Sequence, residues 1–316
     1  MTIVARAPSR AGHGEGETVG PFALAVDLGG TKIAAARVDI SGTITHRRVA
    51  PTPRDGGEAV VAAVIDILHQ LPRPGVCALG VDVPGLAYAD GSVWAPNLPG
   101  WKRMPLGERL SAHFALPTLV ESDRNAFVMG EAWQGAARNC RDAIFFAIGT
   151  GIGAGIISGG RLLRGSHELA GCLGWMTMGS RFLPQYKDVG CLESHLAGPA
   201  IAREASRIRK TATTARELVH LARQGDPVAK KLIAQTGEYL GLALANLVSI
   251  LDPETIVVGG GVAAAGNLLL TPARETMRQW AQPLAGKQVR IVRSRLGARA
   301  ALLGTAKMAF DIACHS

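Results

Sequence analysis

The sequence predicts an α/β fold built from two related lobes. Three glycine-rich turns each follow an apolar run of the length of a buried strand, and segments with helical periodicity separate several strands. The order strand, Gly-Thr turn, strand, Ser-Gly turn occurs near residue 27 and again near residue 149. This weak internal repeat favours two lobes that point their glycine turns at a shared ligand, although two unrelated hairpins are the alternative.

The first turn joins apolar runs at residues 23–26 and 33–38. It contains Asp27, Leu28, Gly29, Gly30, Thr31 and Lys32. Glycines let backbone N–H groups approach an anion closely, and a carboxylate at a strand end can hold a hydrated divalent cation. The turn therefore indicates a site for a nucleotide phosphate, and an ordinary hairpin turn is the alternative when it is taken alone.

Two further glycine clusters follow the predicted strands 144–148 and 255–258. The second turn covers residues 149–155 and begins with Gly149, Thr150 and Gly151; the third cluster consists of Gly259, Gly260 and Gly261. No GxxxxGK[ST] phosphate loop and no GxGxxG dinucleotide pattern is present. Together the turns predict an actin-like, ribonuclease-H-like ATPase fold with a nucleotide cleft between its two lobes.

Helices and strands alternate through the rest of the chain. Helical spacing of apolar residues predicts helices over residues 59–71, 106–114, 125–137 and 228–251, and strands are expected at 76–83 and 118–120. Glu121, Ser122 and Asp123 follow the second of these strands, where α/β sheets place their ligands. Taken alone, Asp123 is also consistent with the N-cap of the next helix.

Composition and charge exclude several classes of protein. Hydrophobic residues make up 47% and charged residues 19%, as in a globular protein, and no apolar run reaches the roughly 18 residues of a membrane-spanning helix. The net charge of +9 is spread along the chain, which argues against nucleic-acid binding. Five scattered cysteines fit the reducing cytoplasm, and residues 1–21 are expected to form a flexible lead and not a signal peptide.

Six motifs occur in the order in which one family of proteins carries them. They read DLGGTK (27–32), NLPGW (97–101), ESDRN (121–125), GTGIGAG (149–155), GCLE (190–193) and VGGGV (258–262). Together they extend over nearly the whole chain from residue 22 onward. The sequence therefore resembles the ROK family of repressors, open reading frames and kinases, and its glucokinase-type members most closely.

The resemblance implies ATP-dependent transfer of a phosphoryl group to a sugar in the cleft. Asp123 would act as the general base on the acceptor hydroxyl, and Asp27 would help to orient Mg²⁺. The nucleotide-binding residues that it implies are Gly29, Gly30, Thr31, Lys32, Gly149, Thr150, Gly151, Gly259, Gly260 and Gly261. The acceptor-binding residues that it implies are Gly85, Asn97, Ser122, Asp123, Cys172, Trp175 and Glu193.

The chain departs from the family at a structural zinc site. Family members hold this zinc with one His and three Cys, but only Cys191 remains here, and Trp175 stands at the His position. One thiolate cannot complete a tetrahedral zinc site, so we expect no zinc. We expect Trp175, Pro184 and Tyr186 to fill the volume by packing.

The same substitutions alter the acceptor pocket. Of four polar groups that bind sugar hydroxyls in glucokinase-type members, only Glu193 is kept, while Cys172, Trp175 and Ser122 replace the others. Each lost hydrogen bond weakens the binding of an ordinary hexose. We therefore expect an acceptor other than plain glucose, such as an amino sugar, a modified hexose or a cyclitol.

The predicted division is a small lobe over residues 22–120, to which a helix within 298–316 returns, and a large lobe over 121–297. The resemblance also implies a homodimer, and neither nucleic acid nor a membrane is an expected partner. A transcription regulator is disfavoured because its helix-turn-helix region would need roughly 60–80 residues before the first motif. A sugar-binding protein with little or no turnover and an ordinary glucokinase are the remaining alternatives.

Overall fold

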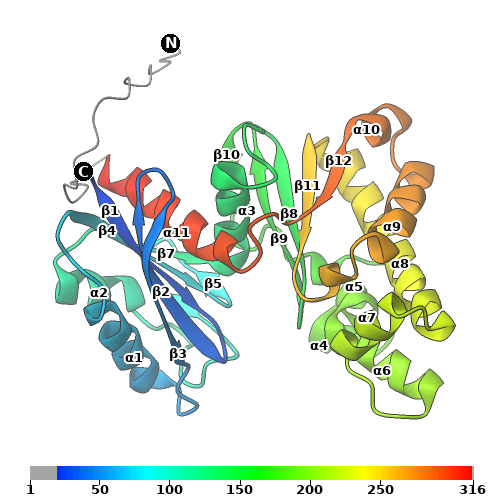
Figure 1. Ribbon diagram of the computed structural model, residues 1–316, viewed down its shortest axis with the longest axis horizontal. Coiled ribbons are helices and arrows are strands. Elements are labelled where there is room, and N and C mark those ends of the chain that lie inside the picture. Colours follow the sequence, from blue (N-terminus) through cyan, green and yellow to red (C-terminus); the bar gives the residue numbers. More distant parts are fainter. Residues whose placement is uncertain (1–19, 315–316) are drawn as a thin grey trace.

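Two five-stranded sheets organise the protein, as the computed structural model shows for residues 20–314 (Figure 1). The predicted N-terminal lead lies outside this described part as far as residue 19, and so do residues 315–316 at the end of the predicted C-terminal segment. Within the described residues, every helix is too short or too polar to cross a membrane.

The first sheet has the strand order β3-β2-β1-β4-β7. Its strands are β1 (Phe22–Leu28), β2 (Lys32–Asp39), β3 (Ile44–Pro51), β4 (Val76–Val83) and β7 (Thr118–Ser122), and a small hairpin of β5 (Leu86–Ala87) and β6 (Val93–Trp94) follows β4. Neighbours among β1, β2 and β3 are antiparallel, whereas β1, β4 and β7 run parallel. The carboxyl ends of these three parallel strands therefore meet at one edge of the sheet.

Helices cover both faces of this sheet. They are α1 (Gly57–His69), α2 (Leu106–Phe114) and α11 (Arg299–Ala313). Leu24 and Val26 of β1 belong to the core shared with α1 and α2, while Ala23 and Ala25 pack against α11 on the opposite face. Successive strand residues point to opposite faces, so small alanines on one side let α11 approach closely. Figure 1 shows this last helix, in red, lying beside the first strand, in blue.

The second sheet has the order β10-β9-β8-β11-β12 and repeats the arrangement of the first. Its strands are β8 (Ala143–Ile148), β9 (Ile152–Ser158), β10 (Arg161–Leu162), β11 (Thr255–Gly259) and β12 (Arg290–Arg293). As in the first sheet, an antiparallel hairpin, β8 and β9, is extended by parallel strands, β11 and β12. The predicted internal repeat is thus a repeat of sheet topology.

A helical layer packs on one face of the second sheet. It comprises η1 (Leu173–Trp175), α4 (Tyr186–Val189), α5 (Cys191–Leu196), α6 (Gly198–Arg209), α7 (Ala215–Arg223), α8 (Pro227–Leu251), η2 (Val262–Ala265), α9 (Asn267–Trp280) and α10 (Pro283–Gln288). Ile144, Phe146 and Ile148 of β8 share their core with α8 and α9. The alternate residues Ala143 and Phe145 face Val128 of α3 (Asp123–Gln134) on the other side.

α3 and α11 cross between the two sheets, where glycine on each helix removes the side chain from the contact (Figure 1). A Cβ atom on Gly130 of α3 would lie 2.0 Å from the carbonyl oxygen of Ala300, and one on Gly304 of α11 would lie 1.8 Å from that of Ala126. Backbone therefore packs directly on backbone. Because α3 begins at Asp123, this crossing holds that residue in place relative to the first sheet.

Several element boundaries differ from the sequence predictions. Helix α3 begins at Asp123, two residues earlier than predicted, and ends at Gln134, three residues earlier than predicted. The predicted turn over 149–155 is wrong in its second half, because β9 begins at Ile152. Gly155 is a strand residue beside α3, where a Cβ atom would lie 2.1 Å from the carbonyl oxygen of Arg124. Glycine is therefore needed at this position for the packing of α3 on β9, and not for a turn.

Candidate active site

Three aspartates come together where the parallel strands of the first sheet end. Asp27 and Asp82 are directly paired in the register of β1 and β4, and Asp82 is paired with Glu121 in the register of β4 and β7. Asp123 follows β7 as the first residue of α3. The electrostatic influence of Asp27 reaches both Asp82 and Asp123, which places the three carboxyl groups in one cluster.

Asp82 is a member of this cluster that sequence reasoning missed. Its side chain is 0% exposed, and one oxygen, Oδ2, accepts a hydrogen bond of 2.8 Å from the Thr305 hydroxyl on α11. The other oxygen, Oδ1, has no hydrogen-bond partner among the described residues. Burial, and then the nearby Asp27, raise the pKa of Asp82 well above its usual range. Only the register of β1 against β4 could have revealed this residue.

Asp123 combines partial burial with a pKa suited to proton transfer. Burial raises the pKa of Asp123 to about 6, against a weaker opposing effect of its backbone hydrogen bond, in which Arg124 N donates to Oδ1 at 2.7 Å. The N-cap position belongs to Ser122, so the interpretation of Asp123 as the cap is wrong. The Ser122 hydroxyl caps no backbone amide and is buried without a partner among the described residues.

The first glycine turn is exposed and held by hydrogen bonds at its base. Gly29 N donates to the carbonyl oxygen of Lys32 at 2.9 Å, and the Thr52 hydroxyl donates to the carbonyl oxygen of Gly29 at 2.7 Å. Gly30, Thr31 and Lys32 are exposed. Burial raises the pKa of Asp27 beside the turn, and the Lys32 ammonium opposes this effect.

The second and third glycine clusters meet in one cavity of about 1040 Å³. Gly149 and Thr150 line it from the β8–β9 turn, and Gly261 lines it from the end of β11. Gly260 has φ +90°, and a Cβ atom there would lie 2.3 Å from the carbonyl oxygen of Ile148, so only glycine fits beside β8. The structure therefore brings together two of the three predicted nucleotide turns, whereas residues of the first turn do not line this cavity.

The same cavity is lined by α6, α7 and the segment between them, which sequence reasoning did not single out. The polar lining residues from this part are Ser206, Thr213, Thr214, Arg216, Glu217, His220 and Arg223. Thr214 is the N-cap of α7 and forms a capping box with Glu217, which fixes this wall of the cavity. The pattern Thr-x-x-Glu in the sequence indicates the start of a helix, but it does not indicate that Thr214 and Glu217 line this cavity.

The predicted acceptor residues lie in different surroundings. Glu193 contacts the first residue of β9, because its Oε2 accepts a hydrogen bond of 2.7 Å from Ile152 N. The Cys172 thiol accepts one of 3.2 Å from the Arg124 guanidinium, next to Asp123. Asn97 is exposed in the loop after β6. At Gly85 a Cβ atom would lie 2.2 Å from the carbonyl oxygen of Trp94, so this glycine lets the small hairpin close on the end of β4.

Glu121 has a structural role in this site. Its Oε1 accepts hydrogen bonds from Ser122 N and Asn125 Nδ2, both at 2.9 Å, and its Oε2 lies 2.7 Å from Arg164 Nη2. Arg124 also donates to the carbonyl oxygen of Glu168 at 2.9 Å. The segment before Cys172 is thereby tied to the start of α3 by two arginines.

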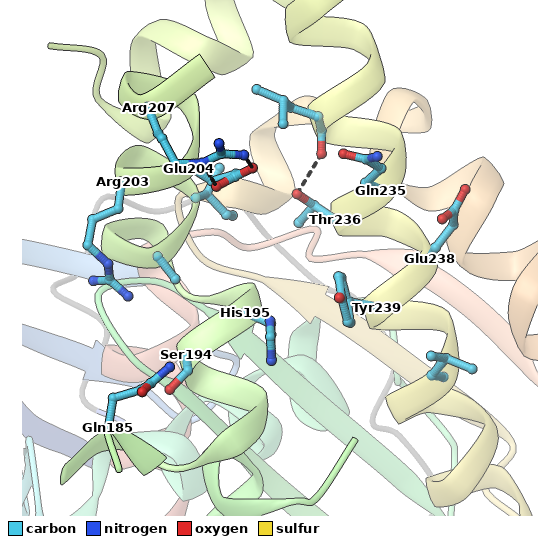
Figure 2. A pocket seen from close by; sticks show the side chains of 14 residues that line it. Gln185, Ser194, His195, Arg203, Glu204, Arg207, Gln235, Thr236, Glu238 and Tyr239 are labelled. Atoms are coloured by element: carbon cyan, nitrogen blue, oxygen red, sulfur yellow. Dashed lines mark hydrogen bonds and ion pairs between the residues drawn. The ribbon is translucent and has the colours of Figure 1, made fainter. Parts of the chain in front are cut away.

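Of the three residues expected to pack in place of zinc, only Tyr186 is buried, whereas Trp175 and Pro184 are exposed, so the packing prediction is wrong for these two. Tyr186 is buried, its hydroxyl lies 3.0 Å from His195 Nε2, and the ring of His195 stacks on Tyr239 at 4.9 Å between centroids. Figure 2 shows His195 and Tyr239 facing a cavity of about 760 Å³ between α5, α6 and α8. This cavity contains none of the predicted site residues. The described residues include no group of three or more His, Cys, Asp or Glu that could hold a metal.

A comparison with known protein families agrees with the resemblance that the ordered motifs indicated. The model of the ROK family matches residues 23–312. The chain belongs to the ROK family.

Relatives and solved structures cover nearly the full length of this ROK protein. It is 34% identical to glucokinase of Streptomyces coelicolor, over 90% of this chain and 96% of that protein. It is 29% identical to N-acetyl-D-glucosamine kinase of Escherichia coli O6:H1, over 89% of this chain and 96% of that protein. The structure of a ROK family glucokinase from Streptomyces griseus with glucose and AMPPNP matches with a TM-score of 0.78 at 31% identity, covering 92% and 99% of the two chains.

Purified protein is expected to contain well under one zinc per chain. This ROK protein keeps one thiol, Cys191, of the four expected ligands, and the Sγ atom of Cys191 accepts a weak hydrogen bond from Met178 N at 3.4 Å. Elemental analysis after dialysis against zinc-containing buffer provides the measurement. About one zinc bound per chain would contradict the prediction.

Proposed function

We propose that this ROK protein is an ATP-dependent kinase that phosphorylates a hydroxyl group of a sugar or sugar-like acceptor, with Asp123 as the general base. The observation that carries the proposal is the placement of Asp123 at the start of α3, beside Asp27 and the strand ends, with its pKa raised to about 6. Such a carboxylate is ionised near neutral pH and accepts a proton more readily than an ordinary aspartate.

ATP is the proposed phosphoryl donor. The cavity of about 1040 Å³ that includes Gly149, Thr150 and Gly261 has room for a nucleotide, and its exposed glycine turn offers N–H and hydroxyl donors to phosphate groups. The first turn, Gly29 to Thr31, would bind phosphates from the opposite lobe. The bound AMPPNP in the Streptomyces griseus relative supports a nucleoside triphosphate in this fold.

The described residues include no group of three side chains that could ligate a metal directly, but a carboxylate at the strand ends fits a role beside a hydrated Mg²⁺. Asp82 Oδ1 is buried without a partner among the described residues, and Asp27 lies beside it at the edge of the exposed first turn. We propose that Asp27 orients the hydrated cation, whose charge would offset that of the phosphates. In this proposal the predicted acceptor residues bind the sugar, and Asp123 removes the proton of the attacking hydroxyl.

The acceptor is proposed to differ from plain glucose. Cys172 is engaged by Arg124, Trp175 is an exposed aromatic residue, and Glu193 is engaged by Ile152 N, so few side chains remain to bind hexose hydroxyls. The relatives include kinases named for glucose and for N-acetyl-D-glucosamine, which supports a sugar acceptor without choosing one. An amino sugar, a modified hexose or a cyclitol is therefore proposed.

The lobes and their assembly complete the proposal. Residues 22–120 would form the small lobe together with the returning C-terminal helix α11, and residues 121–297 would form the large lobe. Their closure around the acceptor would exclude water from the γ-phosphate. We also propose a homodimer, on the strength of the family resemblance.

A panel of acceptors tests this function directly. ADP formation from ATP and Mg²⁺ is expected to depend on an added sugar or cyclitol, and the best acceptor should exceed glucose at least about tenfold in kcat/KM, because unmatched polar groups in a site reject the wrong substrate. Glucose as the best acceptor would instead identify an ordinary glucokinase. Sugar binding without ADP formation would identify a binding protein.

A further inference from the structure

Two large aromatic side chains are exposed around one cavity, and the first of them, Trp175, stands where the family resemblance places a zinc-linked His. Trp175 is 57% exposed and Phe182 is 63% exposed. Together with Tyr186, Lys187 and Cys191 they line a cavity of about 600 Å³. Exposed aromatic residues that gather around a cavity of this size are typical of a small-molecule binding surface.

This aromatic cavity adjoins the proposed acceptor site. Trp175 is the last residue of η1, and Gly174 before it lies so close to Glu193 that a Cβ atom would be 2.9 Å from the carboxylate. Cys172, directly before η1, is bound by Arg124 next to the proposed base. Trp175, at the end of η1, is thus a predicted acceptor residue that also lines the aromatic cavity.

Contacts behind the cavity hold its wall in position. The ring of Tyr186 packs edge-on against Phe182, with centroids 6.0 Å apart, and its hydroxyl is bound to His195. His195 is held in turn by stacking on Tyr239. These contacts preorganise Phe182 and Tyr186, which lowers the entropic cost of binding a rigid ligand.

The chemistry of the cavity suits a second ring. The faces of Trp175 and Phe182 can stack on the C–H face of a ring, while the charged groups of Arg181 and Lys187 can bind oxygen atoms at its edge. An alkyl chain would leave these polar groups unused. We propose that the acceptor carries a second ring that stacks on Trp175 and Phe182, so that it is a glycoside and not a monosaccharide. This inference rests on the proposed function, since it takes the first ring as the one that is phosphorylated.

Matched glycosides test the second ring. Methyl and phenyl glycosides of D-glucose and N-acetyl-D-glucosamine, in both anomers, present the same first ring with and without an aromatic substituent. For at least one pair, kcat/KM of the wild-type protein is expected to be at least about tenfold higher for the phenyl glycoside, which corresponds to about 1.4 kcal/mol. The ratio should fall to about one in Trp175→Ala. Trp280→Ala, which removes a tryptophan of 67% exposure on α9, should keep the ratio.

Binding without turnover separates this inference from the proposed function. Isothermal titration calorimetry of the same glycosides with Asp123→Asn protein measures the preference in Kd when the assigned base is absent. If the wild-type protein phosphorylates no acceptor, the proposed function fails, whereas a tenfold preference of Asp123→Asn for the phenyl glycoside would still support the second-ring site. A preference near one, no binding of either glycoside, or a preference that survives Trp175→Ala would overturn the inference.

Discussion

Replacing Asp123 by asparagine is expected to lower kcat by about 10²–10⁴-fold, because the amide cannot accept the proton of the attacking hydroxyl. The substitution keeps the size of the side chain and the acceptor for Arg124 N. The Kd for ATP should therefore stay within a few-fold of the wild-type value. Steady-state kinetics with the best acceptor and direct nucleotide binding provide the two measurements. Activity that survives the substitution would remove Asp123 from its assigned role.

The pH dependence of the wild-type protein gives a second test of this residue. With a pKa of about 6 for Asp123, kcat/KM should be constant above about pH 7 and fall about tenfold per pH unit below pH 6, as the base becomes protonated. A profile that stays flat down to pH 5 would show that this carboxyl group is not the titrating base.

Burial of the ionised Asp123 carboxylate also lowers the free energy of unfolding at neutral pH. Its folded-state pKa is raised above the unfolded value, so the folded protein binds the proton more tightly and loses stability as pH rises from about 4 to 6. Asp123→Asn should therefore raise the free energy of unfolding at pH 7 by roughly 1–3 kcal/mol, since each pKa unit corresponds to about 1.4 kcal/mol. The gain should vanish near pH 4. Urea unfolding at the two pH values measures it.

Gly304→Ala is expected to lower the free energy of unfolding by about 3 kcal/mol or more. The new methyl carbon would lie 1.8 Å from the carbonyl oxygen of Ala126, and backbone atoms cannot rotate away as a side chain can. An alanine in an exposed helix would instead stabilise by up to about 1 kcal/mol relative to glycine. The sign of the effect therefore reports the close crossing of α3 and α11.

Activity should fall with stability in Gly304→Ala, because α3 carries Asp123 at its first position and a shift of the helix displaces the base. Gly286→Ala on α10 is the matched control, since the nearest atom to its new methyl carbon is the Ala281 methyl carbon at 3.3 Å. We expect a change of less than about 1 kcal/mol there. Equal effects of the two substitutions in urea unfolding would contradict the proposed role of the crossing.

Local patterns in the sequence determined most of the elements and two of the three glycine turns. The apolar run before Asp27 and the glycines after it specify a strand and a tight turn within a few residues, so no distant contact is needed to predict them. The helix predicted at 106–114 is α2 to the residue, because its apolar spacing and its flanking turns are local. The ordered motifs also led to the ROK family, which the family comparison confirmed.

Tertiary structure alone decided the composition of the site. Asp82 joins the cluster because β4 pairs with β1 in one particular register, and its buried partner, Thr305, lies 223 residues away. Gly155 was predicted to be part of a turn. Glycine is required there because the backbone of Arg124 on α3 approaches closely, and that contact comes from another element. The carboxylate of Glu193 contacts Ile152 N through a helix–strand contact of the same kind. Register and close packing depend on pairs of distant segments, and a single sequence carries no local signal for either.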